Sequence, residues 1–224
     1  MEEERLLLEL DLASTAREVI EVFLEDSSEP ELFDEIARAN AGRPEILRLL
    51  LDHPETPEAV RQYINSLMQL PVLPPKTPRA GRTQEQRAES LIQRIQRLNV
   101  SARIQLALKG GREIRGVLAR DSNKEVMLSV LENGKVTVTE IEMIAKSRQS
   151  LEEALRRISK NREWMKNYSV VQALVTNPKT PPGISITHVS DLKTKDLVIL
   201  ERNKNLAEAV RSASKKLLQA RKPK

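Results

Sequence analysis

The sequence predicts an all-α protein, and three patterns support this fold class. Apolar residues recur at spacings of three and four along most of the 224 residues, as they do on one face of a helix. Helix-start motifs return about every ten to fifteen residues, which indicates many short helices. Only Val136–Val138 resembles a strand, and the apolar pair Ile141 and Ile144 that follows it favours a helix instead.

The first part of the chain predicts a series of amphipathic helices. They cover residues 4–12 and 15–24, begin again at Pro30, and resume after Gly42–Pro44 and after the turn His53–Pro57. In that turn Thr56 fits the N-cap position and Pro57 the first helical position. Proline suits this position because its φ is preset and its missing N–H is not needed there.

A Pro-rich segment interrupts this pattern. Residues 70–89 are aperiodic and carry prolines and bases, which is typical of an extended linker. Residues 1–70 hold 17 acidic and 6 basic residues, a net charge of −11, and residues 71–224 hold 15 and 31, a net charge of +16. We therefore expect an acidic helical-repeat module over 1–69 and a basic one over 90–218, followed by a basic tail at 219–224. Such modules either dock on each other or bind separate partners.

The basic part of the chain predicts further short helices. One begins near Ser90, and the next begins at Asn99–Ser101 and ends at Gly110-Gly111. Two segments match the capping box, in which a hydroxyl residue and a glutamate three positions later each accept from the other's backbone amide. These segments are Thr137 with Glu140 and Ser150 with Glu153.

A degenerate repeat indicates how these helices are arranged. Residues 123–133 align with 167–177 at an offset of 44, and the turn at 52–57 aligns with 176–181 at an offset of 124. One short helix pair cannot cover its own apolar face, whereas stacked pairs bury a continuous strip. The pattern therefore predicts an irregular α-solenoid of short helix pairs, with a compact helix bundle as the alternative.

Three segments carry a resemblance to a known class of protein. Asp52–Pro57, Asn161–Tyr168 and Asn177–Pro181 resemble segments of the leucine-rich-repeat-variant and HEAT-like α-solenoids of bacteria, and the likeness covers about residues 42–65 and 100–218. The resemblance implies a scaffold that binds protein partners, and some members of the wider class bind DNA. Some variant-repeat proteins hold an N-terminal Fe–S cluster on cysteines. This chain has no cysteine, so the resemblance does not imply a cluster.

The composition argues against several kinds of site. The chain has no cysteine and only two histidines, His53 and His188, so it lacks the ligands of thiolate and multi-histidine metal sites. Five aromatic residues are too few for a base-stacking platform. The sequence contains no motif of paired carboxylates or of a nucleophile with its base. We therefore expect no enzyme activity, no cofactor and no metal.

The location of the protein is predicted from two further features. No apolar run reaches the roughly 18 residues of a membrane span. The first residues are acidic, where a secretory signal would be basic. We therefore expect a cytoplasmic protein.

The candidate binding residues lie in the basic part of the chain. Trp164 and Tyr168 stand four positions apart in an expected helix, so they would share a face that bases flank. The predicted partner-binding set is Arg112, Arg115, Arg162, Trp164, Lys166 and Tyr168. The aromatic pair also fits a core contact between repeats, and the basic residues also fit a solvated face, so both alternatives stay open.

These observations lead to a predicted function. We expect a non-catalytic scaffold that mediates protein–protein interaction and whose partner presents an acidic surface. The alternative is a sequence-independent nucleic-acid-associated module in residues 90–224, because lysine and arginine neutralise phosphates and release counterions. The sequence specifies neither the identity of the partner nor the oligomeric state.

Overall fold

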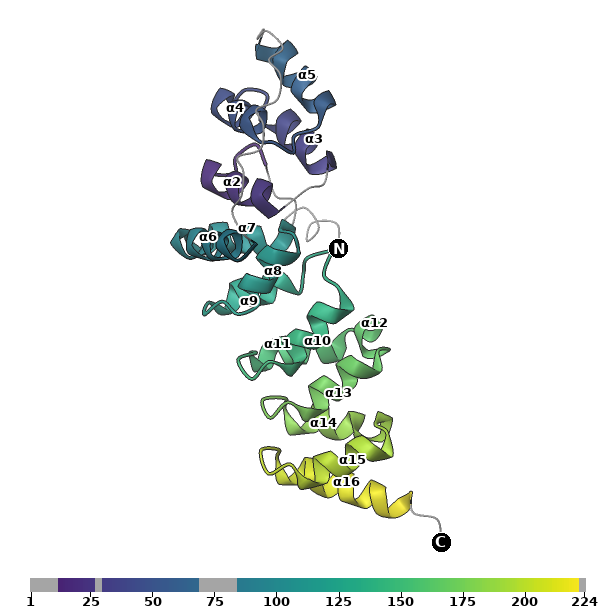
Figure 1. The fold of residues 1–224 in the computed structure, drawn as a ribbon. Helices are drawn as coiled ribbons and strands as arrows, with labels where there is room; N and C mark the ends of the chain where they lie inside the picture. The colour runs from purple at the N-terminus through teal and green to yellow at the C-terminus, as the bar shows by residue number, and fades with distance from the viewer. Residues whose placement is uncertain (1–11, 27–29, 69–83, 222–224) are drawn as a thin grey trace. The chain divides into compact units, whose positions relative to one another are not determined.

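The computed structural model describes residues 12–26, 30–68 and 84–221, and this part of the chain is helical (Figure 1). It holds fifteen α-helices, one 3-10 helix and no strand within those ranges. The all-α prediction is therefore confirmed. The segment that resembles a strand in sequence leads into a helix that begins at Val138.

Contacts group the chain into two compact units, Met1–Leu118 and Ala119–Lys224, called unit 1 and unit 2 below. The helices of unit 1 are α2 (Arg17–Asp26), α3 (Pro30–Ala39), α4 (Pro44–Asp52), α5 (Glu58–Met68), α6 (Gln84–Arg97), α7 (Val100–Lys109) and α8 (Arg112–Leu118). The helices of unit 2 are α9 (Lys124–Val130), α10 (Val138–Lys146), α11 (Glu152–Lys160), α12 (Arg162–Met165), α13 (Tyr168–Thr176), α14 (Pro182–His188), η1 (Val189–Asp191), α15 (Thr194–Arg202) and α16 (Glu208–Ala220).

This division does not coincide with the expected linker at 70–89. Residues 70–83 lie outside the described residues, and residues 84–89 belong to helix α6. Helices α6, α7 and α8 contact α2, so they belong to the same unit as the first helices of the chain. The contact-based units thus have other bounds than the expected modules over 1–69 and 90–218, which stay a prediction.

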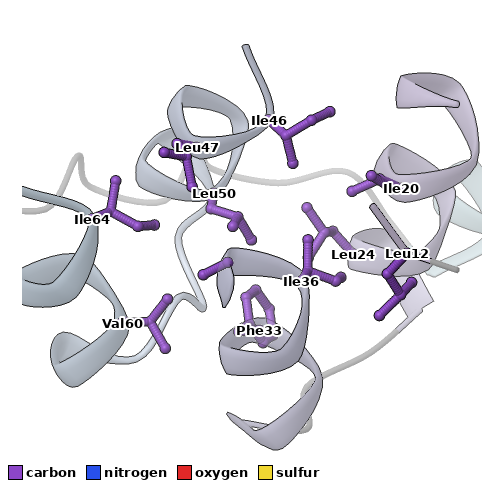
Figure 2. Close-up of a cluster of buried hydrophobic side chains, with 11 residues drawn as sticks. Leu12, Ile20, Leu24, Phe33, Ile36, Ile46, Leu47, Leu50, Val60 and Ile64 are labelled. Atoms are coloured by element: carbon purple, nitrogen blue, oxygen red, sulfur yellow. The ribbon is translucent and has the colours of Figure 1, made fainter. Parts of the chain in front are cut away.

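The apolar stripes of α2 to α5 contribute to one hydrophobic cluster of unit 1 (Figure 2). Phe33 and Ile36 of α3 are fully buried in this cluster, and Figure 2 shows them with side chains of the neighbouring helices. The buried members of the cluster are Leu12, Ile20, Leu24, Phe33, Ile36, Ala37, Ile46, Leu47, Leu50, Val60 and Ile64. Burial of apolar side chains from each of α2 to α5 holds these short helices together, since none of them is long enough to be stable alone.

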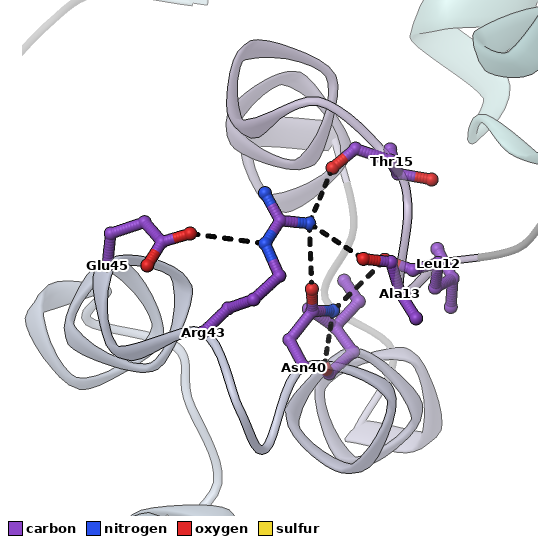
Figure 3. A network of polar contacts seen from close by, with 7 residues as sticks. Leu12, Ala13, Thr15, Asn40, Arg43 and Glu45 are labelled. Atoms are coloured by element: carbon purple, nitrogen blue, oxygen red, sulfur yellow. Dashed lines mark hydrogen bonds and ion pairs between the residues drawn. The ribbon is translucent and has the colours of Figure 1, made fainter.

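A polar network ties the turn between α3 and α4 to the segment that precedes α2 (Figure 3). The Arg43 guanidinium donates to the carbonyl oxygens of Ala13 (3.0 Å) and Thr15 (2.8 Å) and to Asn40 Oδ1 (3.1 Å). Asn40 is fully buried, and its side-chain amide donates to the carbonyl oxygens of Leu12 (3.2 Å) and Ile36 (2.8 Å). These bonds hold the segment before α2 against the turn that follows α3.

Acidic side chains of α2 contact the helices that follow residue 84. Arg94 of α6 forms ion pairs with Glu21 and Glu25 of α2. Asp26 Oδ2 accepts from the backbone N–H of Ile114 in the first turn of α8, at 3.1 Å. Burial raises the pKa of Asp26, and the bond from Ile114 opposes that rise. Part of the acidic segment therefore does contact part of the basic one, within unit 1.

The glycine pair between α7 and α8 fits this close contact. A Cβ on Gly111 would lie 2.5 Å from Asp26 Oδ2, and one on Gly110 would lie 2.4 Å from the carbonyl oxygen of Leu106. Gly110 is the C-cap of α7, so the predicted helix break is confirmed. The predicted start of α7 is also confirmed, because Asn99 is its N-cap and accepts from the N–H of Ala102 at 2.8 Å.

One type of turn recurs in both units. A buried hydroxyl donates to the carbonyl oxygen six residues earlier in the turns that join α4 to α5, α10 to α11 and α13 to α14. These bonds run from Thr56 to Leu50 (2.5 Å), from Ser150 to Ile144 (2.5 Å) and from Thr180 to Leu174 (2.6 Å). Each of these carbonyls lies near the end of a helix and also accepts from the backbone N–H of the C-cap residue three positions later, so the hydroxyl adds a second hydrogen bond there.

The hydroxyl contacts explain two corrections to the predicted helix starts. The Thr56 and Ser150 hydroxyls donate backwards to a helix end, and neither residue holds the N-cap position of the helix that follows. Helix α5 begins at Glu58, and the carbonyl of Pro57 accepts from Val60 at 3.0 Å; Leu151 is the N-cap of α11.

The other predicted capping box is confirmed. Thr137 N–H donates to Glu140 Oε2 at 2.8 Å, and the Glu140 N–H donates to the Thr137 hydroxyl at 3.3 Å. Both bonds join residues three apart at the start of α10, which is the reciprocal arrangement that the sequence motif describes.

The end of unit 2 also differs from prediction. Residues 219 and 220 belong to α16, and the Arg221 guanidinium donates to the carbonyl oxygens of Leu192 (2.7 Å) and Ser190 (2.8 Å). The expected tail at 219–224 is therefore part of the folded unit as far as Arg221, and residues 222–224 lie outside the described residues. Across the described part of the chain, no helix combines the length and apolar character that spanning a bilayer requires.

Candidate functional site

The six predicted partner-binding residues divide between the two units. Arg112 and Arg115 lie in unit 1, and Arg162, Trp164, Lys166 and Tyr168 lie in unit 2. The structure therefore brings together four of the six residues within one unit.

Arg115 is buried, with 4% of its surface exposed. Its guanidinium donates to the carbonyl oxygen of Gly110, the C-cap of α7, at 3.0 Å. The charge of Arg115 thus stabilises a helix end, where carbonyl groups favour a cation. Arg112, three residues earlier on α8, is exposed and keeps a surface position.

Tyr168 is the first residue of α13 and joins it to α15. Its hydroxyl donates to Asp196 and accepts from the backbone N–H of Lys193 at 3.0 Å. The Lys193 ammonium lies 4.6 Å from the ring centroid, within the range of a cation–π contact. Burial and the bond to Asp196 raise the pKa of Tyr168. These contacts fit the alternative in which the aromatic residue packs between helices.

Trp164 does not share a helix with Tyr168. Helix α12 ends at Met165 and α13 begins at Tyr168, so the expected common face at spacing four is wrong. The short helix α12 forms because the Asn161 side chain accepts from the N–H groups of Glu163 (3.0 Å) and Trp164 (3.2 Å). Trp164 is half-buried there.

The two bases beside Trp164 differ in their contacts. Lys166 Nζ lies 2.7 Å from Glu163 Oε1, and both side chains are exposed. Arg162 is exposed and forms no ion pair with any described residue. Arg162 is thus the predicted site residue in unit 2 whose charge is available to a partner without breaking an internal contact.

Sequence reasoning missed a basic groove beside these residues. It is an open depression of about 600 Å³ between α9 and α11, and we call it the α9–α11 groove. Its lining consists of Lys124, Leu151, Glu152, Glu153, Arg156, Arg157 and Lys160. Four of these seven side chains are basic and two are acidic, so the groove has a net positive charge.

Ion pairs organise the charges of the α9–α11 groove. Lys124 of α9 lies 2.5 Å from Glu153 of α11, and Arg156 lies 2.6 Å from Glu152 one helical turn before it. The bond to Glu153 raises the pKa of Lys124, and the same bond lowers that of Glu153. Arg157 pairs with Glu132, from the turn that follows α9.

Some residues of this groove can be recognised in the sequence as a basic cluster. Arg156, Arg157 and Lys160 lie within five residues and fall on adjacent positions of a helix surface. Lys124 and Glu132 are much farther away in the sequence, and only the packing of α9 against α11 brings them near. A search for basic clusters along each expected helix would have found the α11 residues, although not the groove.

The chemistry available at this site is charge recognition. Within the described ranges, no three His, Cys, Asp or Glu side chains gather closely enough to hold a metal ion. The groove offers ammonium and guanidinium groups to carboxylate or phosphate oxygens, and Leu151 adds an apolar contact.

No protein-family model, curated protein or solved structure matches this chain. The resemblance to α-solenoids therefore gains nothing from these comparisons.

Proposed function

We propose that this chain is a non-catalytic helical-repeat scaffold, built as an irregular α-solenoid, that binds a protein partner with an acidic surface. The observation that carries the proposal is the recurring turn, in which Thr56, Ser150 and Thr180 make the same hydroxyl bond in three places. Helices that are joined by one repeated turn favour stacked pairs, and stacked pairs expose a continuous surface for a partner.

Contacts between successive turns add support for stacking. Asn177, in the turn after α13, donates from its side-chain amide to the carbonyl oxygens of Ala145 and Ser147 at the end of α10. Asn40 makes the corresponding contact to Leu12 in unit 1. Bonds of this kind join one turn to an earlier one, which is what adjacent layers of a solenoid require.

The charge of unit 2 supports an acidic partner. Arg162 is exposed without an internal ion pair, and Lys166 has only an exposed pair with Glu163, which a partner could displace at small cost. Trp164 stands between them with part of its ring accessible. An aromatic side chain with neighbouring bases is a common centre of binding energy in protein interfaces.

A charge-reversal experiment tests the proposal. Partners are captured from the native cell by crosslinking to the full chain, and the purified partner is then titrated against the chain at low and raised salt. We expect Arg162→Glu/Lys166→Glu to weaken binding strongly, while Lys215→Glu/Lys216→Glu, two exposed bases on α16, serves as the matched control. Equal binding by both variants and the natural chain would refute the proposed surface.

The same titration separates the alternative function. A nucleic-acid-associated module would bind bare DNA with a steep dependence on salt and little dependence on sequence. If the chain binds DNA in a salt-dependent way and more tightly than it binds the captured protein, the nucleic-acid function replaces the proposed scaffold function.

A further inference from the structure

The cations of the α9–α11 groove are held by exposed carboxylates of the same chain. Lys124 pairs with Glu153, Arg156 with Glu152, and Arg157 with Glu132. The paired side chains keep between 40 and 59% of their surface exposed. Lys160 lines the groove, is exposed, and forms no ion pair with a described residue.

Such pairs are easily exchanged. An exposed ion pair contributes little to stability, because water screens the charges and two long side chains must be held in place. A carboxylate from outside can therefore replace Glu152 or Glu153 as the partner of Arg156 or Lys124 with little loss of energy. Lys160 supplies an additional cation with no internal pair to break.

We propose that the α9–α11 groove binds a short acidic segment of the partner protein, by exchange of its carboxylates for Glu152 and Glu153. The proposal rests on the scaffold function proposed above and names the part of the partner that is recognised. The segment would place carboxylates on Lys124, Arg156 and Lys160 and an apolar side chain against Leu151.

The lining favours a peptide over a nucleic acid. Glu152 and Glu153 stand among the cations, so the groove lacks the uninterrupted row of positive charges that a continuous line of phosphates would match. A peptide can instead alternate acidic with apolar residues and match both the cations and Leu151. The groove lining contains no aromatic side chain on which a nucleotide base could stack.

The test uses the full chain and a fluorescein-labelled peptide of glutamate and leucine, with binding followed by fluorescence anisotropy. We expect Arg156→Glu/Lys160→Glu to weaken binding by about tenfold or more, since it replaces two attractions by two repulsions. Lys215→Glu/Lys216→Glu changes the net charge of unit 2 equally and should weaken it by less than about twofold. Circular dichroism checks that all variants fold.

A second variant tests the exchange itself. Glu152→Gln/Glu153→Gln removes the internal competitors and keeps their size, so the peptide should bind more tightly than to the natural chain. Unchanged or weaker binding to this variant would overturn the exchange. Single-stranded DNA of equal charge is also tested as a competitor. If it displaces the labelled peptide at a lower concentration than the same peptide without label does, nucleic acid is the occupant.

The outcomes also separate this inference from the proposed function. Peptide binding that resists Arg156→Glu/Lys160→Glu, while partner capture still depends on Arg162 and Lys166, overturns the groove and leaves the scaffold standing. Insensitivity of partner capture to all four substitutions overturns both.

Discussion

Asn177 donates from its side-chain amide to the carbonyl oxygens of Ala145, at 2.7 Å, and Ser147, at 2.9 Å, across thirty residues or more of sequence. The donor is buried in the turn between α13 and α14, and the acceptors lie at the end of α10. At the same time its Oδ1 accepts from the N–H of Lys179 at 2.9 Å and shapes its own turn. The Asn177 side chain thus shapes its own turn and also holds that turn against the end of α10.

Replacement of this amide should destabilise unit 2. Asn177→Ala leaves a buried carbonyl without a donor, which costs about 1–3 kcal/mol. Asn203 is the matched control, because it is likewise the C-cap of a helix and, among the described residues, its side chain bonds just to the nearby N–H of Asn205, at 3.0 Å. Urea unfolding followed by fluorescence reports on unit 2 alone, since Trp164 is the only tryptophan in the chain. Equal losses in both variants would contradict the role of the bond between turns.

A core substitution tests the packing of α10 against α13. Leu174 is fully buried on α13, as is Ile141 on α10. Leu174→Ala should cost roughly 2–4 kcal/mol through the cavity that it leaves. Ile199→Ala on α15, where the side chain is 60% exposed, should cost less than about 0.5 kcal/mol. The same fluorescence titration measures both variants. A Leu174→Ala protein as stable as the natural chain would contradict the packing of Leu174 in this core.

The stability of unit 1 should depend on the protonation of His53. Burial lowers the pKa of the ring, the nearby Arg61 lowers it further, and Glu55 acts in the opposite direction. The ring lies 5.4 Å from that of Phe33 in the core. Because the unfolded chain takes up the proton near about pH 6.5 and the folded chain only at lower pH, the folded state loses stability as the pH falls from 6.5 toward the lowered value.

A substitution isolates this effect. His53→Asn places at this turn the residue that three other turns use, at Asn133, Asn177 and Asn203, and it removes the titrating group. Hydrogen exchange of residues 46–64, corrected for intrinsic rates, should show protection that falls between about pH 7 and about pH 5.5 in the natural chain and changes less in the variant. An equal fall in both chains would assign the pH dependence to other groups.

Sequence reasoning predicted those features that depend on neighbours in the chain. The capping box of Thr137 with Glu140 joins residues three apart, and the Gly110-Gly111 break follows from local backbone chemistry. Ser150 satisfies the same local pattern as Thr137, yet its hydroxyl donates to Ile144 instead. The motif alone cannot distinguish these cases, because a hydroxyl can both donate and accept and its partners depend on which groups the folded chain brings near it.

The candidate site was less predictable because it depends on contacts between distant residues. A basic residue looks the same in sequence whether its guanidinium reaches solvent, as for Arg112, or a buried helix end, as for Arg115. The α9–α11 groove likewise requires Lys124 to meet Glu153 across a helix pair. The hydrophobic pattern does not specify which faces of the short helices meet, and the spacing of the charges does not specify it either.

The last prediction concerns two arginines of α8: Arg115 should stabilise unit 1, whereas Arg112 should matter for binding alone. Arg115→Ala should destabilise unit 1 by about 1.5–3 kcal/mol, because it removes a charged hydrogen bond to the carbonyl of Gly110. Arg112→Ala, at an exposed position three residues earlier, should change stability by less than about 0.5 kcal/mol. Hydrogen exchange of residues 100–118 measures both effects.

Partner binding then distinguishes the two arginines. If Arg112 contributes charge to the partner surface, Arg112→Glu weakens capture while the protection of α7 and α8 stays unchanged. Arg115→Glu would place a carboxylate near the Gly110 carbonyl and near Asp26, whose charge Arg115 now offsets, so its effect on capture would follow from loss of structure. Loss of capture by Arg115→Ala with full protection would instead show that this buried side chain reaches the partner, and would reverse the assignment made here.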